Sequence, residues 1–199
     1  IKMSLIQNGA GESAKSFYNA ASTTSFRNIP GTTLTRAYGA SATSATTMSF
    51  GGWVKKSEND FYSNIYSATL GGSGVPQSYI TFQADNKILL QSWTGSANIF
   101  KYITSALFRD TTAWYHLWAQ IDTTDGTAAN RVKLFVNGIR ITAFDTAVNV
   151  GSANTTVVGF NQNLTHYFGH SNASYGGNLY YADWWNLDGQ DVSPVDTVG

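Results

Sequence analysis

Hydrophobic and polar residues alternate with a period of two along three short runs between residues 112 and 144. In the first run, every second residue is apolar or aromatic: Tyr115, Leu117, Ala119 and Ile121. The residues between them would lie on the other face: His116, Trp118, Gln120 and Asp122. Because side chains alternate across a β-strand, this pattern predicts a half-buried strand. Asp125-Gly126 marks the polar loop that ends it.

The next two runs predict a β-hairpin. Asn137-Gly138 separates them, and this dipeptide tolerates the positive φ values of a type I′ turn. A shift of one residue would turn the whole apolar side toward water, so the register is well specified. We therefore expect five residues to face the core together: Val132, Leu134, Val136, Ile139 and Ile141.

Similar alternation predicts further strands at 25–29, 47–55, 65–70, 79–84, 87–93, 99–103, 155–160, 166–169 and 177–187. Asp85-Asn86 is placed to close a hairpin between two of them. No run of ten or more residues has a helical period. Many short strands with frequent turn residues predict an all-β fold, a two-sheet antiparallel jelly-roll sandwich.

Composition agrees with one such domain. Charged residues make up 12% of the 199 residues, about half the usual share. The net charge is zero, so no field attracts nucleic acid or an anionic membrane, and no apolar run is long enough to insert in a bilayer. Residues 1–25 are small and polar without a period. We expect them to form an N-terminal arm for attachment or subunit linking, with the sandwich over 26–199.

Four segments then occur in a recognisable order: MSFGGWVK, WYHLWAQIDTT, NRVKLFVNGIRIT and GGNLYYADWWNLDGQDVSP. Together they resemble the laminin-G-like, or concanavalin-A-like, jelly-roll domain. More narrowly, they resemble its versions in virion structural proteins of tailed bacteriophages. Those versions carry a W-V-K strand, a W-Y-H strand, a K-L-Y-V-N-G hairpin and a closing I-D-G-Q-x-L-x-P. The resemblance spans roughly residues 24 to 195.

This resemblance implies a non-enzymatic virion protein of a tail, fibre or decorated capsid, located on the virion surface and contacting host-surface glycans. The partners it implies are other virion proteins, further copies of the chain in a homo-oligomer (a trimer by analogy) and host polysaccharide. The alternative is a structural decoration or cement protein that binds no sugar. A glycan-active hydrolase is a third reading.

Catalysis is disfavoured because retaining glycoside hydrolysis needs two carboxyl groups roughly 5–5.5 Å apart. Related glucanases supply them with an E-x-D-x-x-E pattern. This chain has two glutamates, Glu12 and Glu58, and neither lies in such a pattern. Asp122 and Asp125 flank a turn, where a solvated loop is the simpler interpretation. We expect no catalytic residues.

Cofactors are not expected either. Related domains bind calcium, which takes six to eight oxygen ligands; calcium stays an open alternative here, without support from any D-x-N-x-D-like cluster. His166 and His170 are four residues apart, yet a strand-to-loop position does not suit chelation, and a third ligand is missing. We expect no metal site.

Glycan contact would need exposed aromatic rings beside loop hydrogen-bonding groups. The loop 161–177 is rich in such groups, although turns use Asn, Ser and Gly in any case. The candidate ligand-binding residues are Trp93, His166, His170, Asn172 and Tyr175.

Other aromatic residues lie inside strand patterns and are predicted to pack in the core or between the sheets: Trp53, Trp114, Trp184 and Tyr181. His116 is predicted to be structural. Asp183 interrupts the apolar closing strand, and a carboxylate there needs a partner if it is buried, so a structural hydrogen bond to an indole N–H or a backbone amide is expected. On this interpretation Asp183→Ala would destabilise the fold.

Overall fold

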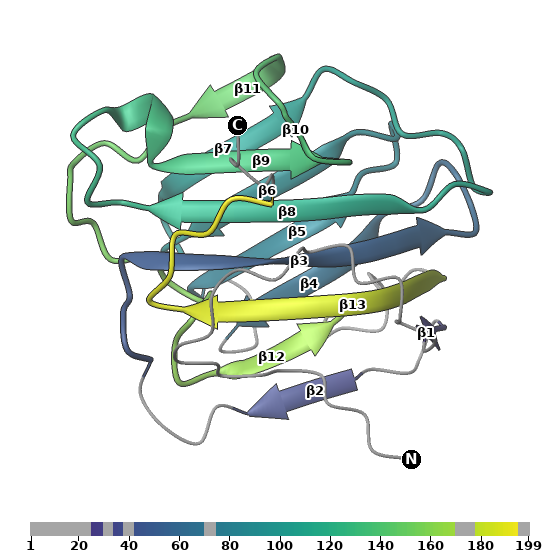
Figure 1. The fold of residues 1–199 in the computed structure, drawn as a ribbon, viewed down its shortest axis with the longest axis horizontal. Coiled ribbons are helices and arrows are strands. Elements are labelled where there is room, and N and C mark those ends of the chain that lie inside the picture. The colour runs from purple at the N-terminus through teal and green to yellow at the C-terminus, as the bar shows by residue number, and fades with distance from the viewer. Residues whose placement is uncertain (1–24, 30–33, 38–41, 70–74, 170–177, 195–199) are drawn as a thin grey trace.

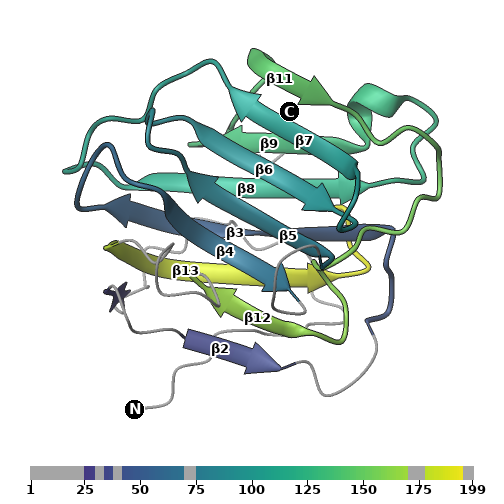
Figure 2. The same ribbon diagram turned by 180° about the vertical axis from the view of Figure 1, so that it is seen from behind.

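The computed structural model describes residues 25–29, 34–37, 42–69, 75–169 and 178–194. Thirteen strands in these segments form two antiparallel sheets that face each other (Figures 1 and 2). The first sheet has the order β1 (Ser25–Asn28), β13 (Leu179–Asp188), β3 (Thr47–Lys56), β8 (Tyr115–Asp122), β9 (Val132–Val136) and β10 (Ile139–Arg140). The second has the order β11 (Phe144–Val148), β7 (Asn98–Thr104), β6 (Ile88–Trp93), β5 (Gln77–Phe82), β4 (Ser63–Thr69), β12 (Thr165–Phe168) and β2 (Leu34–Ala37). The predicted all-β sandwich is confirmed.

The hairpin of β9 and β10 has the predicted tight turn. Asn137 and Gly138 have φ values of 51° and 77°, and Val136 pairs with Ile139 across the turn. The three residues of β9 that were predicted to face the core, Val132, Leu134 and Val136, lie there, and Ile141 packs against it. The predicted burial of Ile139 is wrong, because this side chain is 71% exposed. It lies in a two-residue edge strand, where no further strand covers it.

Three other predictions of secondary structure need correction. Residues 155–160 do not form a strand; Val157 and Phe160 are buried in the core, and Val157 N donates to Ala45 O at 2.9 Å. The alternation there reflects two buried side chains on an irregular segment. The edge strands β2 and β11 were not predicted, because short, half-exposed strands carry little apolar alternation. A 3₁₀ helix, η1 (Ala128–Asn130), also lies in the loop before β9.

Aromatic rings fill one half of the space between the sheets. Trp184 of β13 lies 5.4 Å from Tyr66 of β4 and 5.5 Å from Phe168 of β12, measured between ring centroids. Tyr181 is fully buried, and its hydroxyl donates to Ile65 O at 2.8 Å. The predicted core positions of Trp184 and Tyr181 are thus confirmed. Burial raises the pKa of Tyr181 well above its ordinary value, so the hydroxyl stays protonated as a donor.

A pair of glycines lets neighbouring strands approach β3 closely. A Cβ atom on Gly51 would lie 2.1 Å from Leu117 O of β8, and one on Gly52 would lie 2.6 Å from Asp183 O of β13. Any larger residue would therefore push a strand away.

No helix in the described part of the chain is long and apolar enough to cross a membrane.

Candidate functional site on the outer face of the six-stranded sheet

The sheet pairings place aromatic and charged side chains in rows across the outer face of the six-stranded sheet. In the first row, Tyr180 of β13 pairs with Arg27 of β1 on one side and Lys55 of β3 on the other. The Arg27 guanidinium carbon lies 5.2 Å from the centre of the Tyr180 ring, and Lys55 Nζ lies 5.0 Å from it. Lys55 Nζ also lies 5.9 Å from the Trp114 ring. These distances are within the range of cation–π attraction.

The second row contains Trp53 of β3 and His116 of β8, which are directly paired. Their rings meet edge to face at 5.1 Å, and His116 is stacked against Trp118 at 6.3 Å. His116 is 3% exposed, so its predicted structural position is confirmed. Burial lowers its pKa, and the negative charge of Asp183 opposes that effect in part. The imidazole is therefore neutral at pH 7.

A β-bulge in β13 determines which side chains reach this face. Ala182 pairs with Trp53 and Trp185 pairs with Gly51, so two residues of β13 oppose Gly52 alone. Asp183, the extra residue, has a φ of 48° and is the only non-glycine residue with positive φ inside a described strand. The bulge reverses the alternation after Ala182. Trp184 consequently enters the core, while Asp183 and Trp185 both face solvent.

The structural hydrogen bond predicted for Asp183 is not found among the described residues. Its side chain is exposed, and its carboxylate accepts no hydrogen bond from the described residues. The expectation that Asp183→Ala destabilises the fold loses its basis, because neither desolvation nor a structural hydrogen bond is involved. An aspartate in left-handed backbone geometry is a local strain, and such strain is concentrated at functional sites.

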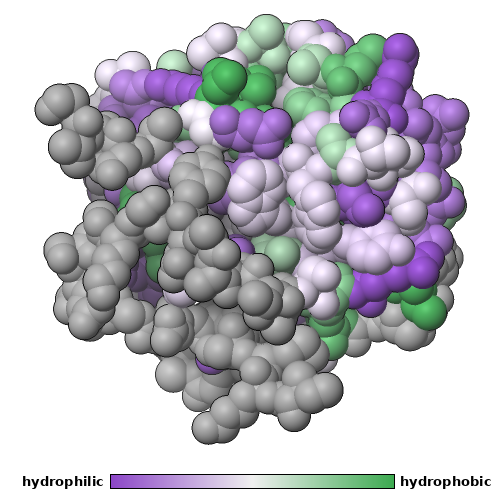
Figure 3. Space-filling view, turned by 45° about the vertical axis from the view of Figure 1, so that its right-hand side comes forward, coloured by the Kyte–Doolittle hydropathy of each residue, from purple (hydrophilic) through white to green (hydrophobic). Residues whose placement is uncertain are grey.

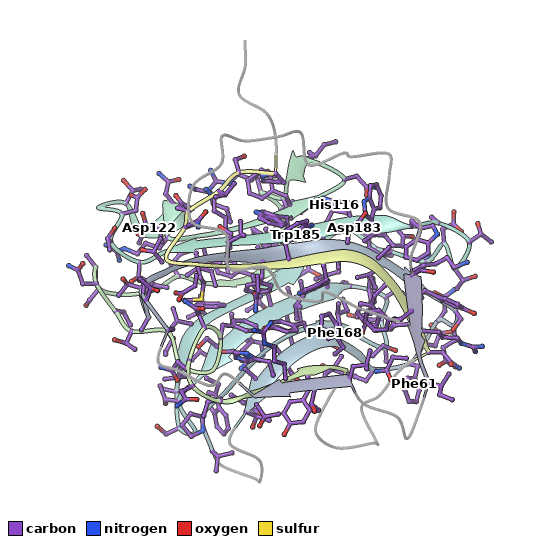
Figure 4. The ribbon with its side chains drawn as sticks, turned by 60° about the horizontal axis from the view of Figure 1, so that its bottom comes forward. Phe61, His116, Asp122, Phe168, Asp183 and Trp185 are labelled. Atoms are coloured by element: carbon purple, nitrogen blue, oxygen red, sulfur yellow. The ribbon has the colours of Figure 1, made fainter. Side chains whose placement is uncertain are left out.

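Figure 4 shows how the bulge separates the two sides of the sheet. Asp183, Trp185 and His116 lie on the outer side of β13, whereas Phe168 lies on the inner side, between the sheets. Figure 3, turned toward the end at which β3 finishes and β13 begins, shows pale side chains of intermediate hydropathy bordered by hydrophilic ones. We call the residues Trp53, Trp114, Tyr180 and Trp185 the aromatic face.

The chain after β13 covers the neighbouring part of the same sheet, where it crosses β3 and β8 (Figure 1). Trp118 Nε1 donates to Val192 O at 2.8 Å, and Val192 N donates to Ser49 Oγ at 2.9 Å. Trp118 is thereby fully buried. This segment bounds the aromatic face on one side and makes Trp118 structural.

Of the five residues that the sequence suggested for glycan contact, the structure describes Trp93 and His166, and these two lie on different faces of the seven-stranded sheet. Trp93 is half-buried at the end of β6, on the outer face of the seven-stranded sheet. His166 is 2% exposed, with Nε2 at 3.2 Å from Gly159 O, and its ring lies 5.7 Å from Tyr66. Burial, reinforced by the charge of Arg36, lowers the pKa of His166 to about 4. His170, Asn172 and Tyr175 lie outside the described residues. Residues 1–24, which form nearly all of the predicted arm, also lie outside them.

The aromatic face contains residues that sequence reasoning assigned elsewhere. Trp53 and Trp114 were predicted to pack inside, but both are half-buried on the outer face. Trp185 is 37% exposed and was not singled out at all. The adjacent pair Trp184-Trp185 is the signal that could have found it, since two tryptophans in succession on a strand must point to opposite faces.

Asp122 and Asp125, the carboxylates considered for catalysis, accept hydrogen bonds within their own turns. Asp122 Oδ1 accepts hydrogen bonds from Thr124 N at 2.9 Å and from Thr124 Oγ1 at 2.6 Å. Asp125 Oδ1 accepts one from Thr127 N at 2.7 Å. Such Asx turns stabilise loops and need no ligand. Among the described residues, no group of three His, Cys, Asp or Glu side chains is placed to hold a metal ion.

Comparison with known proteins identifies the fold. Neither the protein-family models nor the curated proteins include a match to this chain. The solved structures that it resembles include a heptameric SAP-like pentraxin from Limulus polyphemus, with a TM-score of 0.52 and 14% identity over 83% of this chain and 77% of that one. The binding domain of botulinum neurotoxin serotype D gives a TM-score of 0.55 and 15% identity over 85% of this chain and 40% of that one.

The receptor binding domain of a mosaic C/D botulinum neurotoxin gives a similar match, with a TM-score of 0.52, 12% identity, and coverage of 86% of this chain and 40% of that one. The chain therefore spans less than half of these two neurotoxin domains. At such identities the likeness concerns the fold. The protein has the concanavalin-A-like jelly-roll fold, with sheets of six and seven strands.

Proposed function

We propose that the chain is a non-enzymatic, lectin-like domain that binds saccharide on the outer face of its six-stranded sheet. The bulge in β13 carries this proposal, because it turns Trp185 and Asp183 outward side by side. A sugar ring has an apolar side that can stack on an indole and hydroxyl groups that can donate to a carboxylate. Trp53 and Tyr180 extend the aromatic area on the neighbouring positions of the same face.

The position of the protein in an assembly is also a proposal. The resemblance of four sequence segments to virion proteins of tailed bacteriophages supports a place on the virion surface, in a tail, a fibre or a capsid decoration. Its partners there would be other virion proteins and further copies of the chain, and its ligand would be host-surface polysaccharide. A fold shared with a receptor binding domain is compatible with that use.

The experiment is a binding measurement with matched tryptophan variants. We expect the protein to bind host polysaccharide in isothermal titration, and Trp185→Ala to weaken binding at least about tenfold, as loss of a stacking aromatic does. Trp93→Ala is the control, because Trp93 is a half-buried tryptophan on the opposite outer face. The reverse result, loss with Trp93→Ala alone, would move the site to the other sheet and contradict the proposal.

A structural decoration protein without sugar binding is the second candidate. Exposed apolar residues on this chain favour it, since Ile139 is 71% and Leu107 is 43% exposed, and both would be covered by a neighbouring subunit. On that reading the wild type binds no glycan, and Ile139→Asp prevents incorporation into the particle. Release of reducing sugar from host polysaccharide would instead support a hydrolase and contradict both candidates.

A further inference from the structure

Two cations on the aromatic face, Arg27 and Lys55, form no ion pair with a carboxylate of the described residues. Every ion pair found in the described part of the chain involves Lys87, which lies 2.8 Å from Asp145 and 3.2 Å from Asp85. Arg27 donates to the neutral Asn178 Oδ1 at 3.1 Å, and Lys55 is held over aromatic rings. Within the described segments, both positive charges thus contact neutral groups.

Two other cations of the described chain, Arg131 and Lys56, are buried. Arg131 is buried and donates to the backbone carbonyls of Asp125, Gly126, Val150 and Gly151. Lys56, the neighbour of Lys55, is buried with Nζ at 2.7 Å from Asn86 Oδ1. These side chains stabilise loops and present no charge to the surface. Arg27 is exposed and Lys55 half-exposed, so both can meet an external anion.

The geometry around Tyr180 favours a shared anionic ligand. Arg27 and Lys55 lie on the two strands adjacent to β13, so their backbones are about 10 Å apart, with the Tyr180 ring between them. Like charges at this spacing repel each other, and an anion in contact with both would relieve the repulsion while forming charge-assisted hydrogen bonds. A sugar stacked on Trp114 would carry such an anion within reach of Lys55.

Asp183 adds a negative charge to the same face. It lies beyond Ala182, one position farther along β13, and its carboxylate is exposed. It repels a second carboxylate but accepts hydrogen bonds from hydroxyl groups. A saccharide with both kinds of group would therefore be held in one orientation.

From this arrangement we infer that the ligand is a saccharide bearing a carboxylate, a uronate or a sialate. Its charge lies in the row formed by Arg27, Tyr180 and Lys55, and its hydroxyl groups face Asp183. This inference rests on the proposed saccharide function and specifies the class of saccharide.

The test compares each acidic polymer with its neutral form. Polygalacturonate and polysialate are titrated beside their methyl esters, which keep the sugar and lose the charge. We expect the free acid of at least one polymer to bind about tenfold or more tightly than its ester at low salt, with the difference shrinking as salt screens the charges. Which polymer binds distinguishes a uronate from a sialate.

The variants pair a site change with a control of equal charge. Arg27→Gln with Lys55→Met should weaken binding of the acid at least about tenfold and leave the ester unchanged. Lys101→Met with Lys133→Met removes the same charge from β7 and β9 and should leave both affinities unchanged. Circular dichroism and melting curves verify that all variants are folded.

Two results would overturn the inference. Equal affinity for acid and ester, with Trp185 still required, would contradict the anionic class and leave the proposed saccharide function intact. The same holds if the Lys101 and Lys133 control loses as much affinity as the site variant, since binding would then depend on overall charge. Failure of every polymer and every host polysaccharide to bind would contradict the proposed function as well.

Discussion

The outer faces of the two sheets use their polar side chains in opposite ways. On the seven-stranded sheet the Tyr79 hydroxyl donates to Gln91 Oε1 at 2.8 Å, and Gln91 Nε2 donates to Asn98 Oδ1 at 2.5 Å. On the six-stranded sheet, the part of the chain that the structure describes gives Asp183 no hydrogen-bond donor and gives Arg27 and Lys55 no ion pair with a carboxylate. On the first face these three polar side chains bind one another, whereas the second face offers charges to a ligand.

The difference arises from the backbone rather than from composition. Both sheets are antiparallel and both contain register shifts, but only β13 places a non-glycine residue at positive φ within a described strand. That residue turns a tryptophan outward and leaves a carboxylate beside it. A binding face on a β-sandwich is therefore best sought where the pairing of its strands is irregular.

The largest expected effect is at the glycine pair that supports the six-stranded face. Gly51→Ala should lower the free energy of unfolding by about 5 kcal/mol, because its Cβ would meet Leu117 O at 2.1 Å and backbone atoms would have to move. Gly126→Ala, with nothing within 4 Å of the added carbon, is the control and should change stability by less than about 0.5 kcal/mol. Urea denaturation measures both. Equal stability of the two variants would refute the close approach of β3 and β8.

The adjacent tryptophans of β13 test whether the bulge separates core from surface. Trp184→Ala should destabilise the fold by about 4 kcal/mol, since this ring packs among core aromatics and is 6% exposed. Trp185→Ala should cost less than about 1 kcal/mol, since Trp185 faces solvent. Thermal unfolding of both variants decides the matter. A larger loss with Trp185→Ala would mean that the alternation continues without interruption.

Acid should destabilise the inner side of the seven-stranded sheet. The pKa of His166 is lowered from 6.5 to about 4 by burial, so the unfolded chain binds a proton in this range while the folded chain does not. The contribution of neutral His166 to the free energy of unfolding should be fully present above pH 6.5. This free energy should fall by about 3 kcal/mol as the pH approaches 4. His116 on the other sheet adds a loss of the same sign.

Denaturant titrations across this pH range provide the measurement. His166→Asn should flatten the pH dependence, and His116→Asn should flatten it less because Asp183 partly compensates the burial of His116. An unchanged slope in His166→Asn would show that other groups cause the acid sensitivity.

The smallest expected effect concerns Asp183 itself. Asp183→Gly should raise stability by about 1 kcal/mol, because glycine adopts a φ of 48° without the steric cost that a Cβ imposes. The same variant should weaken saccharide binding, since the carboxylate is lost. Asp183→Asn keeps the shape and serves as the control in both assays. A fall in the melting temperature of Asp183→Gly would show that the carboxylate has a structural role after all.

Regular strands could be predicted from the sequence because both of their faces follow a fixed period. The segment of β8 and the turn at Asn137-Gly138 are examples, since alternation and turn chemistry agree there. Ile139 was misplaced because alternation gives the direction of a side chain but not the extent of the opposing sheet. Residues 155–160 were misread because two core side chains on an irregular segment imitate a strand.

The candidate site was not predictable for a related reason. One inserted residue reverses the alternation of β13, and although aspartate tolerates positive φ, an aspartate in an apolar strand does not by itself distinguish a bulge from a polar residue with a structural partner. Trp53 and Trp114 lie in sequence patterns that look the same whether their face is covered or exposed. Only the path of the chain after β13 decides that Trp118 is covered while Trp53 remains half-exposed.

A strand in a packed sandwich usually tolerates substitution far better than a change of length, since one added amino acid exchanges wet and dry side chains from that point on. β13 already contains one such addition, and its two halves have adjusted to it. A chain from which Asp183 is deleted would still send Tyr181 and Trp184 inward and Ala182 and Trp185 outward, on a straighter strand. Deletion of the single codon for Asp183 would therefore leave the composition of the core unchanged and remove one carboxylate from the surface.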